Sequence, residues 1–423
     1  MPKYLKDIFS IIGGASGAHA ITLLAYLYLT RIYSPEMFGV LGLVLAVATF
    51  VAPMMNLGYH WAINLPSSLK HSKDIYWLSN LISLCFCLLL YVLFIFLFNL
   101  VFIFFEDAAI FIILFSPLLA FSQSYINSTK LYLGKIKEFV KVAWLTFFLA
   151  LITNLLQIFL GSFMDPSAAI LIISLIASYL IIIVYVLYLL YPSEKIYSLG
   201  YTFKRYNVFF RQYKELAKFR FPHEFFNSAS QAVPVLLLGI FFDPVIIGLY
   251  VLARTISIAP VTLIGGALNV MISPKLAEIK NNDEKMVPFL RRTTMYFITS
   301  GLAIYSILFF YGEEIFSLAF GSKWAQAGRL AEWLSIWFFS MYITSSISRV
   351  SPLIKAYADD LNFAVARLFV RVTVIVAGGI ASLNIEQLIA LFSICSFILN
   401  VFYIWWFFNK TKSFDSSSGS INV

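Results

Sequence analysis

The chain has 423 residues, of which 61% are hydrophobic and only 12% are charged. An ordinary soluble domain carries roughly 25% charged residues, so this composition excludes a cytosolic enzyme. The apolar stretches are continuous, as from Leu81 to Phe105, which excludes the alternating strands of an outer-membrane barrel. A continuous apolar stretch of about 20 residues is what a helix needs to cross a bilayer.

Twelve such stretches predict an all-α integral membrane protein. The first stretch resembles a signal peptide, but its apolar part is too long and Arg31 follows it in place of a small-residue cleavage site. We therefore expect it to be retained as a membrane span. The predicted spans are approximately 8–31, 38–62, 77–98, 108–130, 139–160, 168–190, 221–242, 246–271, 289–311, 330–350, 363–383 and 387–408.

The distribution of basic residues predicts the orientation. With the N-terminus inside, all but a few of the 30 Lys and Arg residues fall on cytoplasmic segments, Arg367 and Arg371 among them, whereas the outer loops are acidic. Because cytoplasmic loops of membrane proteins carry an excess of Lys and Arg, both termini are expected in the cytoplasm. The net charge of +9 is then explained without nucleic acid.

The two halves of the chain share a sequence pattern. The first outer loop contains Pro35-x3-Gly39, and the outer loop between the seventh and eighth spans contains Pro244-x3-Gly248. Proline and glycine punctuate many loops, but their matching topological positions favour a duplicated six-helix unit, which is a transporter architecture. We predict an N-terminal bundle, a cytoplasmic linker, a C-terminal bundle and a disordered tail, at residues 1–190, 191–220, 221–410 and 411–423.

Charged residues inside a membrane are costly and are therefore candidates for function. Arg254 follows Pro244 by ten residues, which at 1.5 Å per residue places it about 15 Å along the helix, near the bilayer midplane. It could bind carbonyl groups of a broken neighbouring helix, or it could face a water-filled cavity and bind an anion. An arginine suits phosphate because its planar fork donates two hydrogen bonds and stays charged.

His19 also lies near the midplane, after a run of small residues, and could be a structural hydrogen-bonding group or a titratable group that couples transport to protons. Other candidates lie nearer the span ends or are uncharged polar residues within spans. Snorkelling to the headgroups or hydrogen bonding between helices is the alternative interpretation for each of them. They are Arg31, His60, Gln123, Asn127, Asn227 and Gln231.

The cysteines are interpreted as packing residues. Cys85, Cys87 and Cys395 all lie in apolar stretches without neighbouring metal ligands, and their spacing fits no disulfide framework. We expect no metal and no cofactor.

Several of these segments resemble one family. The stretch LTRIYSPEMFG (Leu29–Gly39), the triplet Asn56-Leu57-Gly58, the segment from Asp243 to Tyr250 and the triplet Pro274-Lys275-Leu276 are similar to the polysaccharide flippases of the multidrug/oligosaccharidyl-lipid/polysaccharide exporter (MOP) superfamily. The chain resembles the Wzx-type O-antigen transporters especially. The resemblance implies a MATE-like fold, in which two six-helix bundles enclose a cavity that opens alternately to each side of the bacterial inner membrane.

The resemblance also implies a substrate and partners. Spans one, two, seven and eight line the cavity in such proteins, and relatives that move undecaprenyl-pyrophosphate-linked sugars use cationic cavities with an arginine in span eight. Arg254 stands at the matching position. The implied substrate is a lipid-linked oligosaccharide for surface polysaccharide synthesis, with its tail among the membrane lipids. Coupling to protons or sodium ions and contact with a polysaccharide polymerase stay open.

Two other functions, an antiporter and a membrane enzyme, predict different sequence features. A drug or metabolite antiporter of the same fold would transport cations and would be indifferent to replacement of Arg254. Related drug exporters often carry buried acids in the first bundle, and the first span here has none. A membrane enzyme such as a glycan polymerase would need a large outer domain, but the longest outer loop, about Gly312 to Gly328, holds no acid–base or metal constellation.

Overall fold

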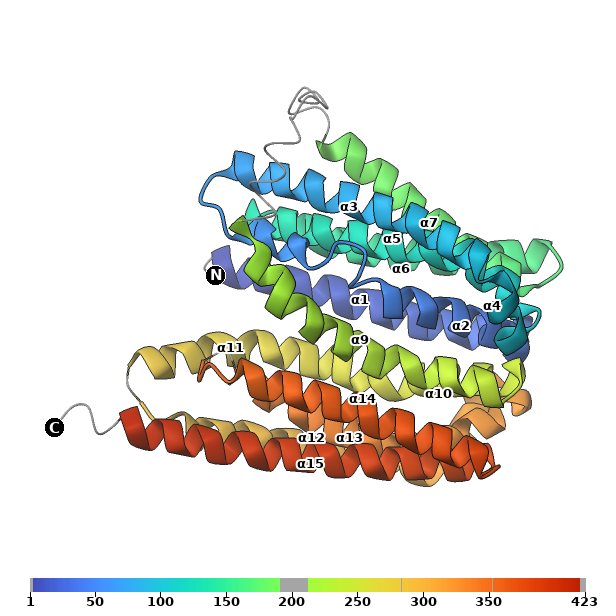
Figure 1. Cartoon of the computed structure of the whole chain (residues 1–423). Helices are drawn as coiled ribbons and strands as arrows, with labels where there is room; N and C mark the ends of the chain where they lie inside the picture. The colour runs from blue at the N-terminus through green and yellow to red at the C-terminus, as the bar shows by residue number, and fades with distance from the viewer. Residues whose placement is uncertain (1–2, 191–211, 283, 352, 419–423) are drawn as a thin grey trace. The chain divides into compact units, whose positions relative to one another are not determined.

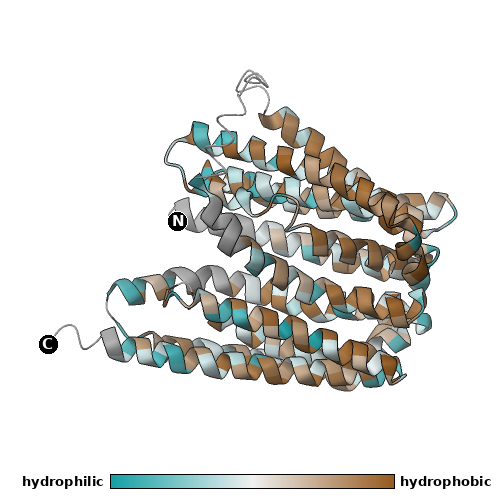
Figure 2. Ribbon diagram, viewed as in Figure 1, coloured by the Kyte–Doolittle hydropathy of each residue, from teal (hydrophilic) through white to brown (hydrophobic). Residues whose placement is uncertain are grey.

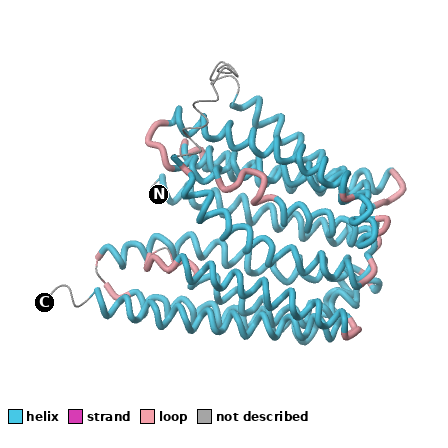
Figure 3. Tube along the Cα trace, viewed as in Figure 1, coloured by secondary structure: helices cyan, strands magenta, loops and turns pink. Residues whose placement is uncertain are grey.

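The computed structural model describes residues 3–190, 212–282, 284–351 and 353–418. Within these ranges every regular element is a helix, and the helices are joined by short loops (Figure 3). The chain divides into two compact units, Met1–Gly248 and Leu249–Val423. The division falls inside one helix, and each unit is described below by itself.

Within its described residues, 3–190 and 212–248, the first unit holds eight α-helices and one short 3₁₀ helix, η1 (Figure 1). They are α1 (Lys3–Ile32), α2 (Pro35–Val51), η1 (Tyr59–Asn64), α3 (Leu69–Phe96), α4 (Phe98–Phe105), α5 (Ala108–Lys135), α6 (Phe139–Phe163), α7 (Ala168–Leu190) and α9 (Lys214–Phe241). The second unit begins within α10. Its elements are α10 (Pro244–Pro260), the π-helical turn η2 (Val261–Gly265), α11 (Gly266–Asn281), α12 (Met286–Phe320), η3 (Ser322–Trp324), α13 (Ala325–Ile347), α14 (Tyr357–Ile380) and α15 (Ile385–Ser418).

The helices confirm the predicted all-α membrane architecture. Nine helices in the described ranges are long and apolar enough to cross a membrane, and α1, α2 and α13 occupy the other three predicted spans. Large apolar side chains lie exposed along the helices, for example Phe96, Leu318 and Ile95. Figure 2 shows that hydrophobic residues dominate the helix lengths, with many of the hydrophilic ones near the ends. An apolar exterior of this extent fits lipid rather than water, so the chain is a multi-pass membrane protein.

The first unit is built around α5. This helix packs against α3, α2 and α7, while α6 lies between α1 and α7. A buried cluster at the α3–α5 contact includes Tyr76, Tyr125 and Leu133. Cys87 is buried at the same contact and its thiol lies 3.4 Å from the carbonyl oxygen of Pro117, as expected of a packing residue.

The two Pro-x3-Gly motifs are helix starts. Ser34 caps α2 by accepting a hydrogen bond from the Met37 N–H, and Pro35 occupies the first helical turn. Such residues favour helix initiation because proline has no N–H to satisfy and the cap satisfies another. The second motif begins α10 in the same way at Pro244, and both helices have 17 residues.

The two copies differ after those 17 residues. Past Val51 the chain leaves the helix for a turn that contains Leu57 and Gly58, both with positive φ. At the corresponding place in the second copy, α10 continues through the π-helical turn η2 into α11. The span predicted over residues 38–62 is therefore interrupted, while the one predicted over 246–271 is extended to Asn281.

Each glycine of the repeated motif lies directly against the backbone of the other copy. A Cβ atom built at Gly39 would lie 1.8 Å from the carbonyl oxygen of Pro244, and one at Gly248 would lie 1.7 Å from that of Pro35. The contact is reciprocal and lies within the first unit. Glycine is required at both positions because any side chain would overlap a carbonyl group, so the repeat also marks a helix crossing.

In the second unit α13 packs against α12 and α15, and α14 packs against α15. At one end of these helices Arg329 donates hydrogen bonds to Glu313 and Glu386, at 2.6 and 2.7 Å. The segment from Gly312 to Phe320, which was predicted as part of an outer loop, instead continues α12 beyond a kink at Tyr311.

The C-terminal tail differs from the predicted domain organisation. Helix α15 continues to Ser418, so the tail predicted to be disordered from residue 411 is helical that far, and Asp415 accepts a hydrogen bond from the Val287 N–H at the start of α12. Residues 419–423 and residues 191–211 of the predicted linker lie outside the described ranges. The division into bundles 1–190 and 221–410 stays a prediction, since α9 packs on α2 within the first unit.

Candidate functional site

The structure distributes the predicted site residues between the two units. Arg254 belongs to the second unit, and all the others belong to the first. Several side chains of the first unit are exposed, namely those of His19 on α1, Arg31 in the last turn of α1, Asn127 on α5 and Asn227 on α9. These four side chains lie on three different helices, α1, α5 and α9.

The two glutamines are half-buried. Gln123 on α5 forms a hydrogen bond with the hydroxyl of Tyr179 on α7. It therefore joins two helices of the first unit, which is the structural alternative considered for it. Gln231 lies on α9, one helical turn after Asn227.

His60 is the centre of a buried polar network in the first unit. Its Nδ1 atom lies 2.6 Å from Oδ1 of Asn56, and its Nε2 atom lies 3.8 Å from Oε2 of Glu224 on α9. The Asn56 amide donates to Ser124 of α5 at 2.9 Å, and Ser124 shares a 3.0 Å hydrogen bond with Ser83 of α3. The network thus links η1, α9, α5 and α3 through side chains that are largely buried.

Asn56 also holds the turn that interrupts the second span. Its Oδ1 atom accepts a 3.2 Å hydrogen bond from the N–H of Gly58, next to the two residues of positive φ. The Asn56-Leu57-Gly58 triplet is therefore a structural motif: the asparagine fixes a left-handed turn and orients His60.

We expect Asn56→Ala to destabilise the protein by about 1–3 kcal/mol, because it leaves the buried groups of Ser124, Gly58 and His60 without this partner. Unfolding of the purified protein in detergent measures the effect. Asn127→Ala is the matched control, since Asn127 is exposed and such substitutions usually change stability by less than about 0.5 kcal/mol. Equal stability of the two variants would contradict a structural role for Asn56.

Arg254 lies in the middle of α10 and is half-buried. Its Nε atom is buried and has no hydrogen-bond partner. In the part of the chain that the structure describes, no carboxylate pairs with it and no carbonyl group accepts a hydrogen bond from it. The interpretation of Arg254 as an arginine bound to carbonyls of a broken helix is thus not what the described contacts show.

A second arginine, the buried Arg371, lies near Arg254. Arg371 of α14 interacts electrostatically with Arg254 and with Arg367, which precedes it by one helical turn. Arg371 is only 5% exposed, and its guanidinium lies 4.5 Å from the centre of the Trp337 ring of α13. Such cation–π stacking stabilises a buried guanidinium without neutralising its charge.

Arg367 has a different environment. Its guanidinium lies 4.7 Å from the centre of the Tyr403 ring of α15, and the Tyr403 hydroxyl donates a 2.9 Å hydrogen bond to Asp360. Asp360 also interacts electrostatically with Arg367. Asp360 thus interacts with Arg367, and Arg371 interacts with both Arg367 and Arg254. We call these four residues the arginine cluster.

The arginine cluster was not foreseen as a unit. The sequence places Arg367 and Arg371 near the cytoplasmic end of a span that begins at residue 363, but α14 begins at Tyr357, and both arginines lie in the middle of the helix. Asp359 and Asp360 were a usable signal, because acidic residues are favoured in the first turn of a helix and indicate an earlier start. The four-residue spacing of the arginines was a second signal, since it places both on one helix face.

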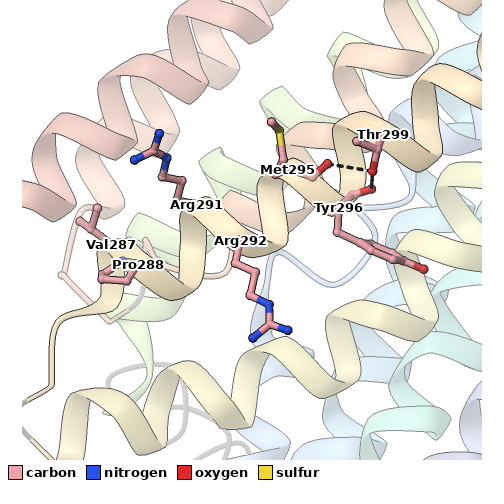
Figure 4. Close-up of a pocket in the computed structure, with 7 residues that line it drawn as sticks. All are labelled: Val287, Pro288, Arg291, Arg292, Met295, Tyr296 and Thr299. Atoms are coloured by element: carbon pink, nitrogen blue, oxygen red, sulfur yellow. Dashed lines mark hydrogen bonds between the residues drawn. The ribbon is translucent and has the colours of Figure 1, made fainter.

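The second unit also has an open groove along the first half of α12 (Figure 4). It has a volume of about 620 Å³ and is lined by Val287, Pro288, Arg291, Arg292, Met295, Tyr296 and Thr299. Arg291 and Arg292 are exposed and point away from the helix in different directions. All seven lining residues belong to α12, so none of them comes from a helix on the opposite side of the groove. Because Arg291 and Arg292 are exposed, their substitution is a control for substitutions in the arginine cluster.

The fold is that of the MATE transporters. Over 99% of both chains, the structure superposes with a TM-score of 0.75 and 12% sequence identity on a multidrug resistance MATE family transporter of the MOP superfamily in an inward-facing conformation. It is also similar to the lipid II flippase MurJ in an inward closed conformation, with a TM-score of 0.65, 14% identity and coverage of 95% of this chain and 89% of that one. A MOP superfamily transporter from Pyrococcus furiosus matches with a TM-score of 0.65, 12% identity and coverage of 98% and 96%.

The sequence defines the family more narrowly than the fold does. Residues 28–329 match the profile of the polysaccharide biosynthesis protein family, and this chain belongs to that family. No curated protein matches the sequence. The predicted relationship to polysaccharide biosynthesis proteins is confirmed, and the predicted MATE-like fold is confirmed by the solved structures named above, which are transporters and a flippase.

Proposed function

We propose that this chain is a flippase that moves polyprenyl-diphosphate-linked oligosaccharide across the bacterial inner membrane for surface polysaccharide synthesis. Membership of the polysaccharide biosynthesis family supports the pathway. The fold, which is shared with a lipid II flippase, supports translocation of a lipid-linked substrate.

The observation that carries the proposal is the unpaired Arg254 in the middle of α10. An arginine within a membrane segment normally pairs with an acid or with carbonyl groups, because an isolated charge is costly there. A guanidinium without such a partner is suited to a substrate that brings its own negative charge. The phosphate groups of a lipid-linked sugar supply that charge, and the arginine fork matches their geometry.

The proposed movement follows from the amphipathic nature of the substrate. Its sugars and diphosphate are too polar to cross the hydrocarbon unaided, whereas its lipid tail is stable within the bilayer. The head group would bind Arg254 from the cytoplasmic side, while the tail stays among the lipids. A change from inward-open to outward-open would then release the head group on the other side, driven by a proton or a sodium gradient.

A gene deletion tests the proposed function. We expect a strain that lacks the gene to accumulate lipid-linked oligosaccharide on the cytoplasmic face of its inner membrane and to lose the corresponding surface polysaccharide. Isotope labelling of the lipid fraction, with enzymatic probing of inverted and right-side-out vesicles, measures both amount and sidedness. Normal surface polysaccharide in the deletion strain, with no accumulated intermediate, would exclude this function.

A further inference from the structure

A histidine and a carboxylate face each other where η1 meets α9 in the first unit. The Nε2 atom of His60 lies 3.8 Å from Oε2 of Glu224, and the two side chains are only 10% and 21% exposed. Removal of one charge from a buried ion pair is strongly destabilising, because the other charge is left uncompensated. The strength of this contact therefore depends on whether the histidine holds its second proton.

The hydrogen bonds of Asn56 determine which ring nitrogen of His60 donates. The amide nitrogen of Asn56 donates to Ser124 at 2.9 Å, and its Oδ1 atom accepts from the N–H of Gly58 at 3.2 Å. Because Nδ1 of His60 lies 2.6 Å from the same oxygen, Nδ1 must carry a hydrogen. In a neutral imidazole the other nitrogen is then an acceptor, so Nε2 would direct a lone pair at the carboxylate of Glu224.

One added proton converts this contact from repulsive to attractive. Both ring nitrogens of an imidazolium donate, and the two acceptors that they need, Oδ1 of Asn56 and Oε2 of Glu224, are in place. The proton belongs on the histidine, because an imidazole is more basic than a carboxylate. The opposite charges then attract each other more strongly than they would in water, since the surroundings have a lower dielectric constant.

The pair lies where two irregular backbone segments meet. His60 follows the left-handed turn at Gly58, and Glu224 follows Pro222, one of two prolines inside α9. A proline within a helix removes a backbone hydrogen bond and bends the helix. A Cβ atom built at Gly58 would lie 3.3 Å from Cβ of Phe221, so the turn and α9 are in close contact here. This contact can open at the turn and at the proline without the loss of a regular helix.

We propose that His60 binds one proton against Glu224 when the contact between η1 and α9 closes and releases it when the contact opens. The pair is then the proton-coupling site of the transporter. This proposal rests on the proposed function and specifies its driving ion as the proton. Coupling is reciprocal: a proton that stabilises the closed contact is also bound more tightly by it, so a proton gradient can drive the movement.

Other titratable groups lie on the elements around the pair. Helix η1 packs against α3, α5 and α9, and α9 also packs against α2 and α4. The single charged residue of α2 and α4 is Glu36, in the first turn of α2. The titratable residues of η1, of the first turns of α3, of the last turns of α5 and of the described part of α9 are, besides the pair, Tyr59, Lys70, His71, Lys73, Asp74, Tyr76, Lys130, Tyr132, Lys135 and His223. Histidine is the side chain that ordinarily changes charge between about pH 5 and 8.

Magnetic resonance of the histidine rings tests the proton site in the full-length protein. The chain has four histidines, so isotope-labelled rings can be assigned by single substitutions, with His60→Gln identifying the signal of His60. We expect Glu224→Gln to raise by about tenfold or more the proton concentration at which His60 is half-protonated, because an opposite charge at this distance favours the charged form. Glu106→Gln is the matched control, since it removes an exposed carboxylate from the same unit.

Translocation in liposomes tests the use of the proton. We expect an imposed pH gradient to accelerate translocation by the wild type severalfold and to have no effect on the rate of His60→Gln. A merely structural role of His60 would lower the rate and the unfolding temperature but leave the acceleration by the gradient unchanged. His71→Gln is the control, because it removes an exposed histidine from α3 and should respond to the gradient like the wild type.

Three results would overturn the proposal. They are an unchanged titration of His60 in Glu224→Gln, an equal change in Glu106→Gln, and wild-type acceleration of His60→Gln by the pH gradient. Failure of the proposed function looks different: the gene deletion would then accumulate no lipid-linked sugar, while Glu224→Gln still altered the titration of His60. In that case the proton site would stand and would serve the transport of another substrate.

Discussion

Replacement of Arg254 by alanine is expected to reproduce the deletion phenotype, with lipid-linked oligosaccharide held on the cytoplasmic face. The substitution removes a guanidinium whose buried Nε atom has no hydrogen-bond partner in the described part of the chain, so a substrate phosphate loses charged hydrogen bonds of about 1.5–3 kcal/mol each. Arg254→Lys should restore transport in part, since an ammonium group retains the charge but not the two-pronged geometry. Complementation of the deletion strain, scored by surface polysaccharide, measures both variants.

Loss of folding can be separated from loss of binding in this case. Among the residues that the structure describes, no carboxylate pairs with Arg254 and would be left unpaired by its removal, so the alanine variant should express and unfold like the wild type. Arg291→Ala, on the exposed groove of α12, controls for the general loss of one positive charge. Full rescue by Arg254→Ala would remove Arg254 from the transport mechanism and would favour an antiporter for cations.

The second large effect is expected at the reciprocal glycine contact. Gly39→Ala or Gly248→Ala would place a methyl group within 2 Å of a backbone carbonyl oxygen, and backbone atoms cannot move aside as a flexible side chain can. Overpacking of this kind typically costs about 1–3 kcal/mol, and we expect the upper end or more here. If a variant stays folded instead, we expect the N-terminal ends of α2 and α10 to move apart.

Unfolding and cross-linking distinguish those outcomes. Gly134→Ala and Gly266→Ala are controls within helices, since a Cβ atom at either position would meet nothing within 4 Å. Cysteines introduced near the starts of α2 and α10 should cross-link efficiently in an otherwise wild-type protein and poorly with Gly39→Ala. Wild-type stability, cross-linking and transport in both glycine variants would refute a required close contact.

Features that depend on local sequence were predicted well. The spans follow from hydropathy alone, and the starts of α2 and α10 follow from Pro35 and Pro244, because helix capping involves only a few neighbouring residues. Arg254 was found because one unpaired charge in an apolar segment is conspicuous. The resemblance to polysaccharide flippases followed from short motifs, whose residues prove to cap a helix, fix a turn and permit a crossing.

Features that depend on tertiary contacts were missed. Nothing in the sequence around Arg371 indicates that Trp337, on another helix, will stack on it, or that Arg254 lies near it. The hydrogen bond from Asn56 to Ser124 likewise cannot be predicted without knowing that α5 lies beside the turn. Hydropathy located α14 too late by several residues because its first turn is acidic, and this error concealed the depth of both arginines.

Translocation by the purified protein in liposomes tests the central claim most directly. The substrate is a fluorescent sugar joined through diphosphate to a short polyprenol, and a membrane-impermeant quencher reports how much of it reaches the opposite leaflet. We predict that wild-type protein moves the lipid far faster than protein-free liposomes do, and that Arg254→Ala, reconstituted at equal density, does not. Equal translocation by both proteins, or none by the wild type under proton and sodium gradients alike, would contradict the account.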